Sequence, residues 1–175
     1  MPLAVGLTER YPLIMNDFSK TDRLMQRGAI FLGSQYAIMC GAMSWVSERN
    51  LVSAISNAGG FGVIACGAMT PELLETEIAA TQALTDKPFG VNLITMHPQL
   101  FDLIEVCDKA GVSHVVLAGG IPPKGSVEAI KGGQNPAKVI CFAPTLALAK
   151  KLLRSGADAL VIEGMEAGGH IGPVS

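Results

Sequence analysis

Residues 87–120, KPFGVNLITMHPQLFDLIEVCDKAGVSHVVLAGG, contain the pattern that decides the fold. The apolar runs Phe89–Leu93 and Val112–Leu117 each predict a buried strand. Between them, apolar residues recur every three or four positions, as on one face of a helix, at Leu100, Leu103, Ile104 and Cys107. Ala110-Gly111 closes that helix. The stretch therefore predicts a βαβ unit, in which a crossover helix joins two parallel strands.

The same alternation continues on both sides of this unit. Four further strands are predicted, at Tyr36–Cys40, Phe61–Ala65, Val139–Phe142 and Ala159–Glu163. The further helices are one capped by Ser47 and ending at Ala58-Gly59-Gly60, one opened by Thr70-Pro71-Glu72, a short weak one after Gly119–Pro123, and one over Thr145–Ser155. Strands that alternate with helices in this way predict a parallel α/β fold.

Glycines and polar residues gather where the predicted strands end, at Gly41, Gly67, Asn92, Gly119-Gly120 and Glu163. In a (β/α) barrel these ends meet at one mouth, where active sites lie. The predicted fold class is therefore α/β, a (β/α) TIM-type parallel barrel. A full barrel has eight strands in about 250 residues, so this chain is expected to hold about the first six strand–helix units. Residues 28–175 are predicted to be this partial barrel, and residues 1–27 an unassigned N-terminal extension.

The composition is that of a globular chain. Of its 175 residues, 49% are hydrophobic and 16% charged, so the chain can bury a core and is too apolar to be disordered. A net charge of -2 without a basic block, and only 5% aromatic residues, argue against binding to nucleic acid. Polar residues and glycines interrupt the long uncharged stretches, so no membrane span is predicted, and no secretory signal is visible. We therefore expect a cytoplasmic protein.

The cysteines and two of the histidines are predicted to have structural roles. Cys40, Cys66, Cys107 and Cys141 are far apart, and none has a spacing typical of metal ligands. We predict free thiols without a catalytic role, and no metal site. His97 precedes Pro98 at a helix start, and His114 lies inside a strand, which favours structural roles for both.

The segment 156–172, GADALVIEGMEAGGHIG, carries a candidate site. Its strand breaks at Glu163 into a loop in which glycines surround His170. Glycines let the backbone approach a planar ligand closely while an imidazole faces it, which predicts a cofactor site with an acid/base. The alternative is an ordinary strand followed by a glycine turn and a surface histidine.

Four segments together resemble a known family. They are GAMSWVS (41–47), SNAGGFG (56–62), KPFGVN (87–92) and the loop 163–172. In this order they resemble successive motifs of the nitronate monooxygenase family, formerly called 2-nitropropane dioxygenases, which includes FMN-dependent enoyl-acyl-carrier-protein reductases. The resemblance is collinear from about Phe31 to the C-terminus, and several motifs in order are more specific than one glycine motif. It implies a (β/α) barrel with FMN at its mouth.

The resemblance also implies a role for individual residues. Backbone of the 41–43 segment would run along the flavin edge, the Asn92 amide would hydrogen-bond the ring, and the loop after Glu163 would pass beneath it. The implied cofactor-binding residues are Gly41, Ala42, Met43, Asn92, Glu163, Gly168 and Gly169. From the residues alone, Asn92 can equally satisfy backbone groups at a strand end, and Met43 and Trp45 can be core residues.

His170 is the implied catalytic residue, and it suits two reactions. It would act as acid/base in the oxidation of alkyl nitronates with O2, which is the first expectation for this oxidoreductase. The alternative is an NAD(P)H-dependent FMN enoyl-acyl-carrier-protein reductase. Segment 142–149, FAPTLALA, lacks the basic residue and histidine that many nitronate oxidisers carry there, which favours this alternative.

A third interpretation concerns completeness. Family members hold the FMN phosphate with loops after strands seven and eight, and this chain ends at Ser175 before either. The chain alone is therefore either part of a longer enzyme, which we expect, or a non-catalytic fragment. The expected partner is a small-molecule substrate, either a nitronate or an enoyl thioester. A homo-oligomer stays open because exposed sheet edges favour pairing with another chain.

Overall fold

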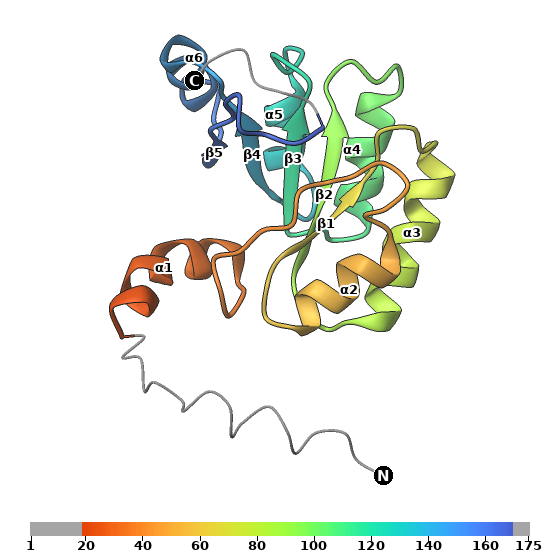
Figure 1. Ribbon diagram of the computed structural model, residues 1–175. Coiled ribbons are helices and arrows are strands. Elements are labelled where there is room, and N and C mark those ends of the chain that lie inside the picture. The colour runs from red at the N-terminus through yellow and green to blue at the C-terminus, as the bar shows by residue number, and fades with distance from the viewer. Residues whose placement is uncertain (1–18, 170–175) are drawn as a thin grey trace.

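The computed structural model describes residues 19–169. After a first helix, α1 (Ser19–Leu32), helices and strands alternate along the chain (Figure 1). The strands are β1 (Gly62–Ala65), β2 (Phe89–Ile94), β3 (His114–Ala118), β4 (Lys138–Phe142) and β5 (Ala159–Val161). The other helices are α2 (Arg49–Asn57), α3 (Pro71–Leu84), α4 (Leu100–Lys109), α5 (Ser126–Gly132) and α6 (Leu146–Arg154). The predicted boundary between residues 27 and 28 falls inside α1, and the domain division itself stays a prediction.

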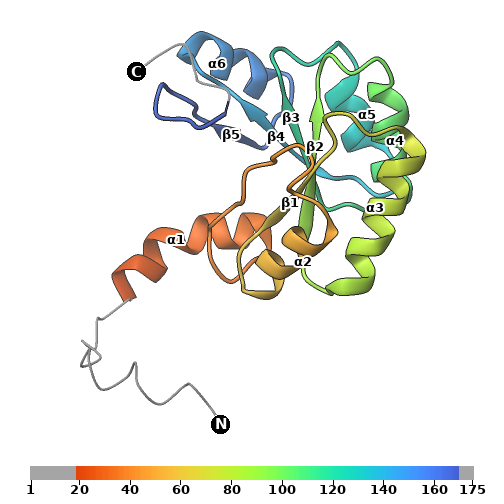
Figure 2. The ribbon, with the colours of Figure 1, turned by 45° about the vertical axis from the view of Figure 1, so that its right-hand side comes forward.

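The strands form one parallel sheet in sequence order, β1-β2-β3-β4-β5 (Figure 2). Five of the predicted strands are present, with small shifts at their ends. The predicted strand Tyr36–Cys40 is reduced to a single parallel bridge between Met39 and Phe61, because its parallel ladder with the segment before β1 is limited to the hydrogen bonds around that bridge. A sequential parallel sheet connected by helices is part of a (β/α) barrel, which confirms the predicted fold class.

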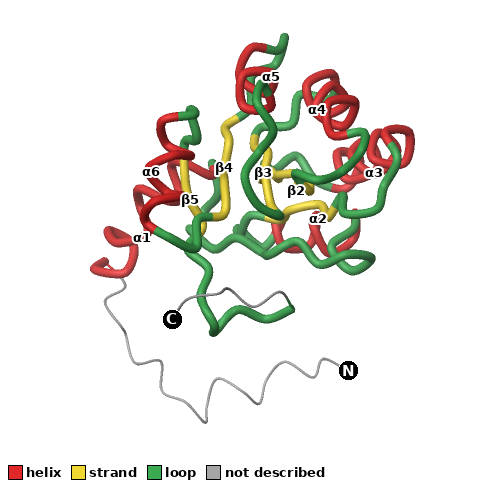
Figure 3. Tube along the Cα trace, turned by 90° about the horizontal axis from the view of Figure 1, so that it is seen from above, coloured by secondary structure: helices red, strands yellow, loops and turns green. Residues whose placement is uncertain are grey.

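The two faces of the sheet pack against different partners. One face, which includes Val91, Leu93 and Val115, forms the main core with the helices. Figure 3 shows α2 to α6 outside the arc of strands. The inner face forms a second cluster around Phe61 and Val63, with Leu32 of α1. Both faces are apolar, as expected for a parallel sheet buried on both sides.

Most helix starts follow the sequence signals, and one does not. Thr70 caps α3 through its side-chain oxygen, which accepts a hydrogen bond from the Leu73 N–H, and Thr145 caps α6 in the same way. The predicted cap of α2, Ser47, is wrong: Glu48 is the cap, and its carboxylate accepts from the Asn50 and Leu51 N–H groups. Ser47 instead bonds within the preceding loop, where its hydroxyl accepts from the Met43 N–H and donates to the Gly41 carbonyl.

The amino-terminal end of the sheet is closed by α1. There, the buried His114 ring lies edge-on to Phe31 and Phe61, with centroids 5.3 and 4.8 Å away. The Phe31 carbonyl, in the last turn of α1, receives hydrogen bonds from His114 Nε2, at 2.9 Å, and from Lys138 Nζ. Donors at the last carbonyls of a helix satisfy groups that have no partner within it. We call Phe31, Phe61, His114 and Lys138 the closed end.

Candidate active site

The loops that follow the strands lie together at the opposite end of the sheet, and we call them the mouth. They are residues 40–48, 66–70, 95–99, 119–125, 143–145 and 162–169. Six of the predicted cofactor residues are in these loops, and Asn92 lies on β2 close to them. The predicted catalytic residue, His170, lies just outside the described residues. The part of the chain that the structure describes therefore places every predicted cofactor residue at one end of the sheet.

The first predicted segment, Gly41 to Met43, lies in an open and well-fixed loop. A Cβ built on Gly41 would have no neighbour within 4 Å, so nothing in the described chain fills the space beside this backbone. The loop is held by Ser47, whose carbonyl also accepts a 3.0 Å hydrogen bond from the Ala65 N–H at the end of β1. Backbone that is fixed and open on one side suits contact with a flat ligand.

Asn92 lies on the inner face of the sheet, toward the mouth. Its partners in the register are Ala65 on β1 and Val116 on β3, and Val116 belongs to the inner cluster. Asn92 is 7% exposed, and no hydrogen bond joins its side-chain amide to another described residue. The backbone-satisfying role is therefore not seen in the described chain. A nearly buried amide without a protein partner is available to a ligand.

The loop after β5 is a turn that opens toward solvent. The Gly164 N–H donates to Glu166 Oε1 at 3.2 Å, and the Ala167 N–H donates to the Gly164 carbonyl at the same distance. Gly168 and Gly169 have no neighbour within 4 Å of a built Cβ, and Gly169 has a left-handed φ of 77°. This space fits backbone that passes under a planar ring. Glu163, two residues after β5, is half-buried at the start of the turn.

The structure shows two features of the mouth that the sequence did not predict. Trp45 is 74% exposed and has a φ of 63°, so the interpretation of Trp45 as a core residue is wrong, and the same holds for the exposed Met43. Thr95, directly after β2, has a buried hydroxyl without a hydrogen-bond partner among the described residues. Neither feature has a local sequence signal.

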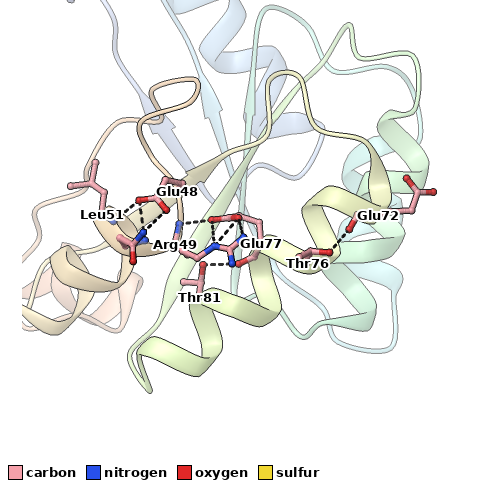
Figure 4. A network of polar contacts seen from close by, with 8 residues as sticks. Glu48, Arg49, Leu51, Glu72, Thr76, Glu77 and Thr81 are labelled. Carbon is pink, nitrogen blue, oxygen red and sulfur yellow. Dashed lines mark hydrogen bonds and ion pairs between the residues drawn. The ribbon is translucent and has the colours of Figure 1, made fainter.

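The base of the mouth is supported by an ion pair between α2 and α3 (Figure 4). Arg49 Nη2 lies 2.6 Å from Glu77 Oε2, and the Arg49 Nε and backbone N–H also donate to the same carboxylate. Burial alone would raise the pKa of Glu77, but the hydrogen bonds from Arg49 hold it below its usual range. Since Arg49 follows the 40–48 loop directly, this pair fixes the end of that loop.

The cysteines are free, and the two other histidines make local hydrogen bonds that suit structural roles. All four cysteines are free, and burial raises the pKa of Cys66 and of Cys141 to about 11, which leaves both as inert thiols. His97 Nδ1 accepts from the Gln99 N–H just before α4, and His114 belongs to the closed end. Residues 19–169 contain no cluster of side chains that could bind a metal ion.

Comparison with known proteins identifies the family. The model of the family "Nitronate monooxygenase" matches residues 28–114. The chain belongs to this family. FabK from Thermotoga maritima is a solved structure that is 40% identical, with a TM-score of 0.80, over 85% of this chain and 47% of that one. The chain therefore shares the family's fold as well as its sequence motifs.

The names of two curated relatives of the present chain indicate two different activities. One, from Mycobacterium tuberculosis, is "(3aS,4S,5R,7aS)-5-hydroxy-7a-methyl-1-oxo-octahydro-1H-indene-4-carboxyl-CoA dehydrogenase", 36% identical over 82% of this chain and 40% of the relative. The other is a "Probable nitronate monooxygenase" from Staphylococcus haemolyticus, 31% identical over 81% of this chain and 49% of the relative. The chain thus spans less than half the length of both relatives. No helix among the described residues is long and apolar enough to cross a membrane.

Proposed function

We propose that this chain carries part of the active site of an FMN-dependent oxidoreductase that acts on a small organic substrate. The observation that carries the proposal is the Asn92 amide, which is nearly buried, lies near the mouth and has no hydrogen-bond partner among the described residues. A flavin ring has hydrogen-bonding groups along one edge, which such an amide can bind. The open backbone at Gly41, Gly168 and Gly169 leaves room for the ring.

Bound FMN would supply the redox chemistry, accepting or donating a hydride equivalent that no amino-acid side chain can carry. The chain's own residues would bind and orient the ring: Asn92 through its amide, and Gly41 to Met43 through their backbone. His170 would hold or move the substrate proton next to the ring. An imidazole suits this role because its ordinary pKa, about 6.5, lies near neutral pH.

The first candidate reaction is the oxidation of alkyl nitronates with O2. It is supported by the family to which the chain belongs and by the match at residues 28–114. In this reaction His170, as the imidazolium, would hold the nitronate anion next to the ring. With a neutral nitroalkane it would first take the proton from the carbon next to the nitro group, which forms that nitronate.

The second candidate reaction is the NAD(P)H-dependent reduction of an enoyl thioester. It is supported by the relative named as a carboxyl-CoA dehydrogenase, which is 36% identical, against 31% for the nitronate monooxygenase relative. Residues 142–149, which run from the end of β4 into α6, also contain no basic residue and no histidine. In this reaction His170 would donate a proton to the substrate carbonyl or its α-carbon.

A flavin-retention assay followed by a turnover assay tests the proposal. The 175-residue chain is mixed with FMN, free flavin is removed, and bound flavin is read from its visible absorbance; we expect retained flavin. Turnover of ethyl nitronate with O2 is then compared with turnover of crotonyl-CoA with NADH. His170→Gln should lose turnover and keep flavin, whereas the matched control His97→Gln should keep both. A folded chain that retains no FMN would contradict the proposal for this chain.

A further inference from the structure

Trp45 has an unusual backbone conformation. Its φ of 63° makes it the one non-glycine residue with a left-handed φ within residues 19–169. This region is costly for a bulky side chain because its Cβ approaches the backbone. Such strain persists only where the surrounding structure imposes it, and it is concentrated at functional sites.

Hydrogen bonds from both sides of Trp45 impose this conformation. The Met43 carbonyl accepts from the Val46 N–H at 3.0 Å and from the Ser47 N–H at 2.8 Å, which closes a tight turn around Trp45. Ser47 is buried, and its hydroxyl and carbonyl tie the turn to Gly41 and to the Ala65 N–H at the end of β1. The turn is therefore fixed by groups other than the indole.

The indole of Trp45 makes few packing contacts that could offset the cost of this strain. It is 74% exposed, although large aromatic side chains are usually well buried. The turn folds over the end of β1: a Cβ on Gly67 would lie 3.1 Å from Ser44 Oγ and 3.9 Å from Ile94 Cγ1. Figure 2 shows the connection between α1 and α2 passing in front of the strands. Trp45 thus lies beside the described strands, at the mouth.

The surroundings of Trp45 are apolar and poor in charge. Residues 40–47, 66–70 and 95–99 contain no Asp, Glu, Lys or Arg. Other large apolar side chains of the mouth loops are exposed as well: Met43, Val46, Met96, Ile121, Ile162 and Met165. Several exposed apolar side chains in loops at one end of the sheet indicate a binding site, and at a barrel mouth such a site faces the substrate.

We propose that Trp45 is a specificity-determining residue, whose indole packs on the apolar chain of the organic substrate at the mouth. The proposal rests on the proposed function, because it places the apolar part of the substrate next to the bound FMN. It goes beyond that function by assigning the strained turn at Trp45 to the recognition of substrate chain length. The strained conformation lowers the stability of the fold, and the protein keeps it because the turn presents the indole to the substrate.

A series of substrates that differ only in chain length tests this role. Values of kcat/KM for primary nitronates with two to six carbons are measured from O2 consumption by the FMN-loaded chain. Each added methylene is expected to raise kcat/KM by up to about fourfold if the indole buries it. Trp45→Ala should reduce the gain per methylene by about half, and Trp45→Phe should keep most of it. The control is Leu24→Ala, a similarly exposed residue on α1, which should leave the gain unchanged.

A second measurement separates this role from a role in folding. Trp45→Gly removes both the indole and the strain, so its Tm should rise by about 2 to 4 °C while the gain per methylene falls. Opposite changes in stability and in substrate preference are expected only where strain serves binding. A lower Tm for Trp45→Gly would mean that the indole supports the fold, and it would overturn the proposal.

The outcomes distinguish this proposal from the proposed function. If FMN is retained and Trp45→Ala keeps the full gain per methylene, the role of Trp45 is overturned and the flavin function stands. If no FMN is retained, the flavin function fails for this chain. The nitronates are then added to the protein, and the fluorescence of its single tryptophan is measured. A chain-length-dependent change in that emission would support the contact, and no change would overturn it.

Discussion

The two ends of the sheet differ in how many of their side chains are packed and hydrogen-bonded within the described chain. At the closed end, α1 covers the strands, and the His114 ring is enclosed by Phe31 and Phe61 with both ring nitrogens hydrogen-bonded. At the mouth, glycines face open space, Asn92 has no hydrogen-bond partner among the described residues, and Trp45 is exposed and strained. Groups that bind a ligand must stay free in the protein alone, so the mouth gives up stability that the closed end retains.

This difference predicts where substitutions act. A change at the closed end should affect the free energy of unfolding and leave ligand binding largely intact in the folded molecules. A change at the mouth should do the reverse. The same separation is general in (β/α) barrels, where one end serves stability and the other chemistry.

The largest effect is expected for Phe61→Ala at the closed end. Phe61 is fully buried between β1 and the His114 ring, so its removal leaves a cavity and should lower the free energy of unfolding by about 3 to 5 kcal/mol. Urea denaturation followed by circular dichroism measures this. Phe101→Ala, at a half-exposed ring on α4, is the control, with an expected loss below about 1 kcal/mol. Equal losses for both variants would remove the basis of the comparison.

A pair of glycine substitutions gives the next largest effect. A Cβ on Gly62, at the start of β1, would lie 2.4 Å from the Val52 carbonyl oxygen, so Gly62→Ala should cost about 1 to 3 kcal/mol. Gly41→Ala has free space, so its unfolding free energy should change by less than about 0.5 kcal/mol. The effects on FMN binding should be reversed. Gly41→Ala should raise the Kd for FMN about tenfold if one ring contact is lost, and Gly62→Ala should leave that Kd largely unchanged in the folded molecules. A stable Gly62→Ala variant would show that β1 and α2 can separate without cost.

Much of the fold follows from hydrophobic periodicity, because parallel strands and their crossover helices leave a strong local signal. The βαβ unit of residues 87–120 is predicted almost to its ends. The cap of α2 is predicted wrongly because two adjacent residues, Ser47 and Glu48, can both serve. The Ser47 hydroxyl is occupied by the turn at 41–47, so the Glu48 carboxylate caps the helix. That choice depends on loop contacts that a local pattern does not contain.

The site is predictable as far as residue types mark it. The glycines and Asn92 can be predicted as site residues because their chemistry is unusual at strand ends, and their roles stay predictions. The exposure of Trp45 has no such local mark. The turn that carries Trp45 is tied to the sheet by the hydrogen bond from the Ala65 N–H to the Ser47 carbonyl, across 18 positions of the chain. Closure of the opposite end by α1 was also missed, because α1 begins in a segment with weak periodicity and contacts strands more than 80 positions away, as in the Phe31–His114 bond.

The closed end should also respond to pH. Burial, and then the nearby Lys138 charge, lower the pKa of His114 below its ordinary 6.5, against an opposing contribution from the Phe31 carbonyl. Below that ordinary pKa the unfolded chain binds more protons at this position than the folded one, so stability falls as pH falls, by at most about 1.4 kcal/mol per pH unit. Urea midpoints of the wild type and His114→Gln between pH 7.5 and 5 measure the effect. The variant should show a flatter pH dependence, and parallel curves would contradict the assignment.

The smallest change in stability, with a large change in binding, is expected for Asn92→Leu. Leucine keeps the branched shape of asparagine, and the substitution removes an amide that has no hydrogen-bond partner among the described residues. The unfolding free energy should therefore change by less than about 0.5 kcal/mol or rise slightly. FMN retention should be lost, because the ring would face a methyl group where it needs a donor or acceptor. A variant that is destabilised by 2 kcal/mol or more would mean that Asn92 supports the fold, and the two ends of the sheet would then differ less than their contacts indicate.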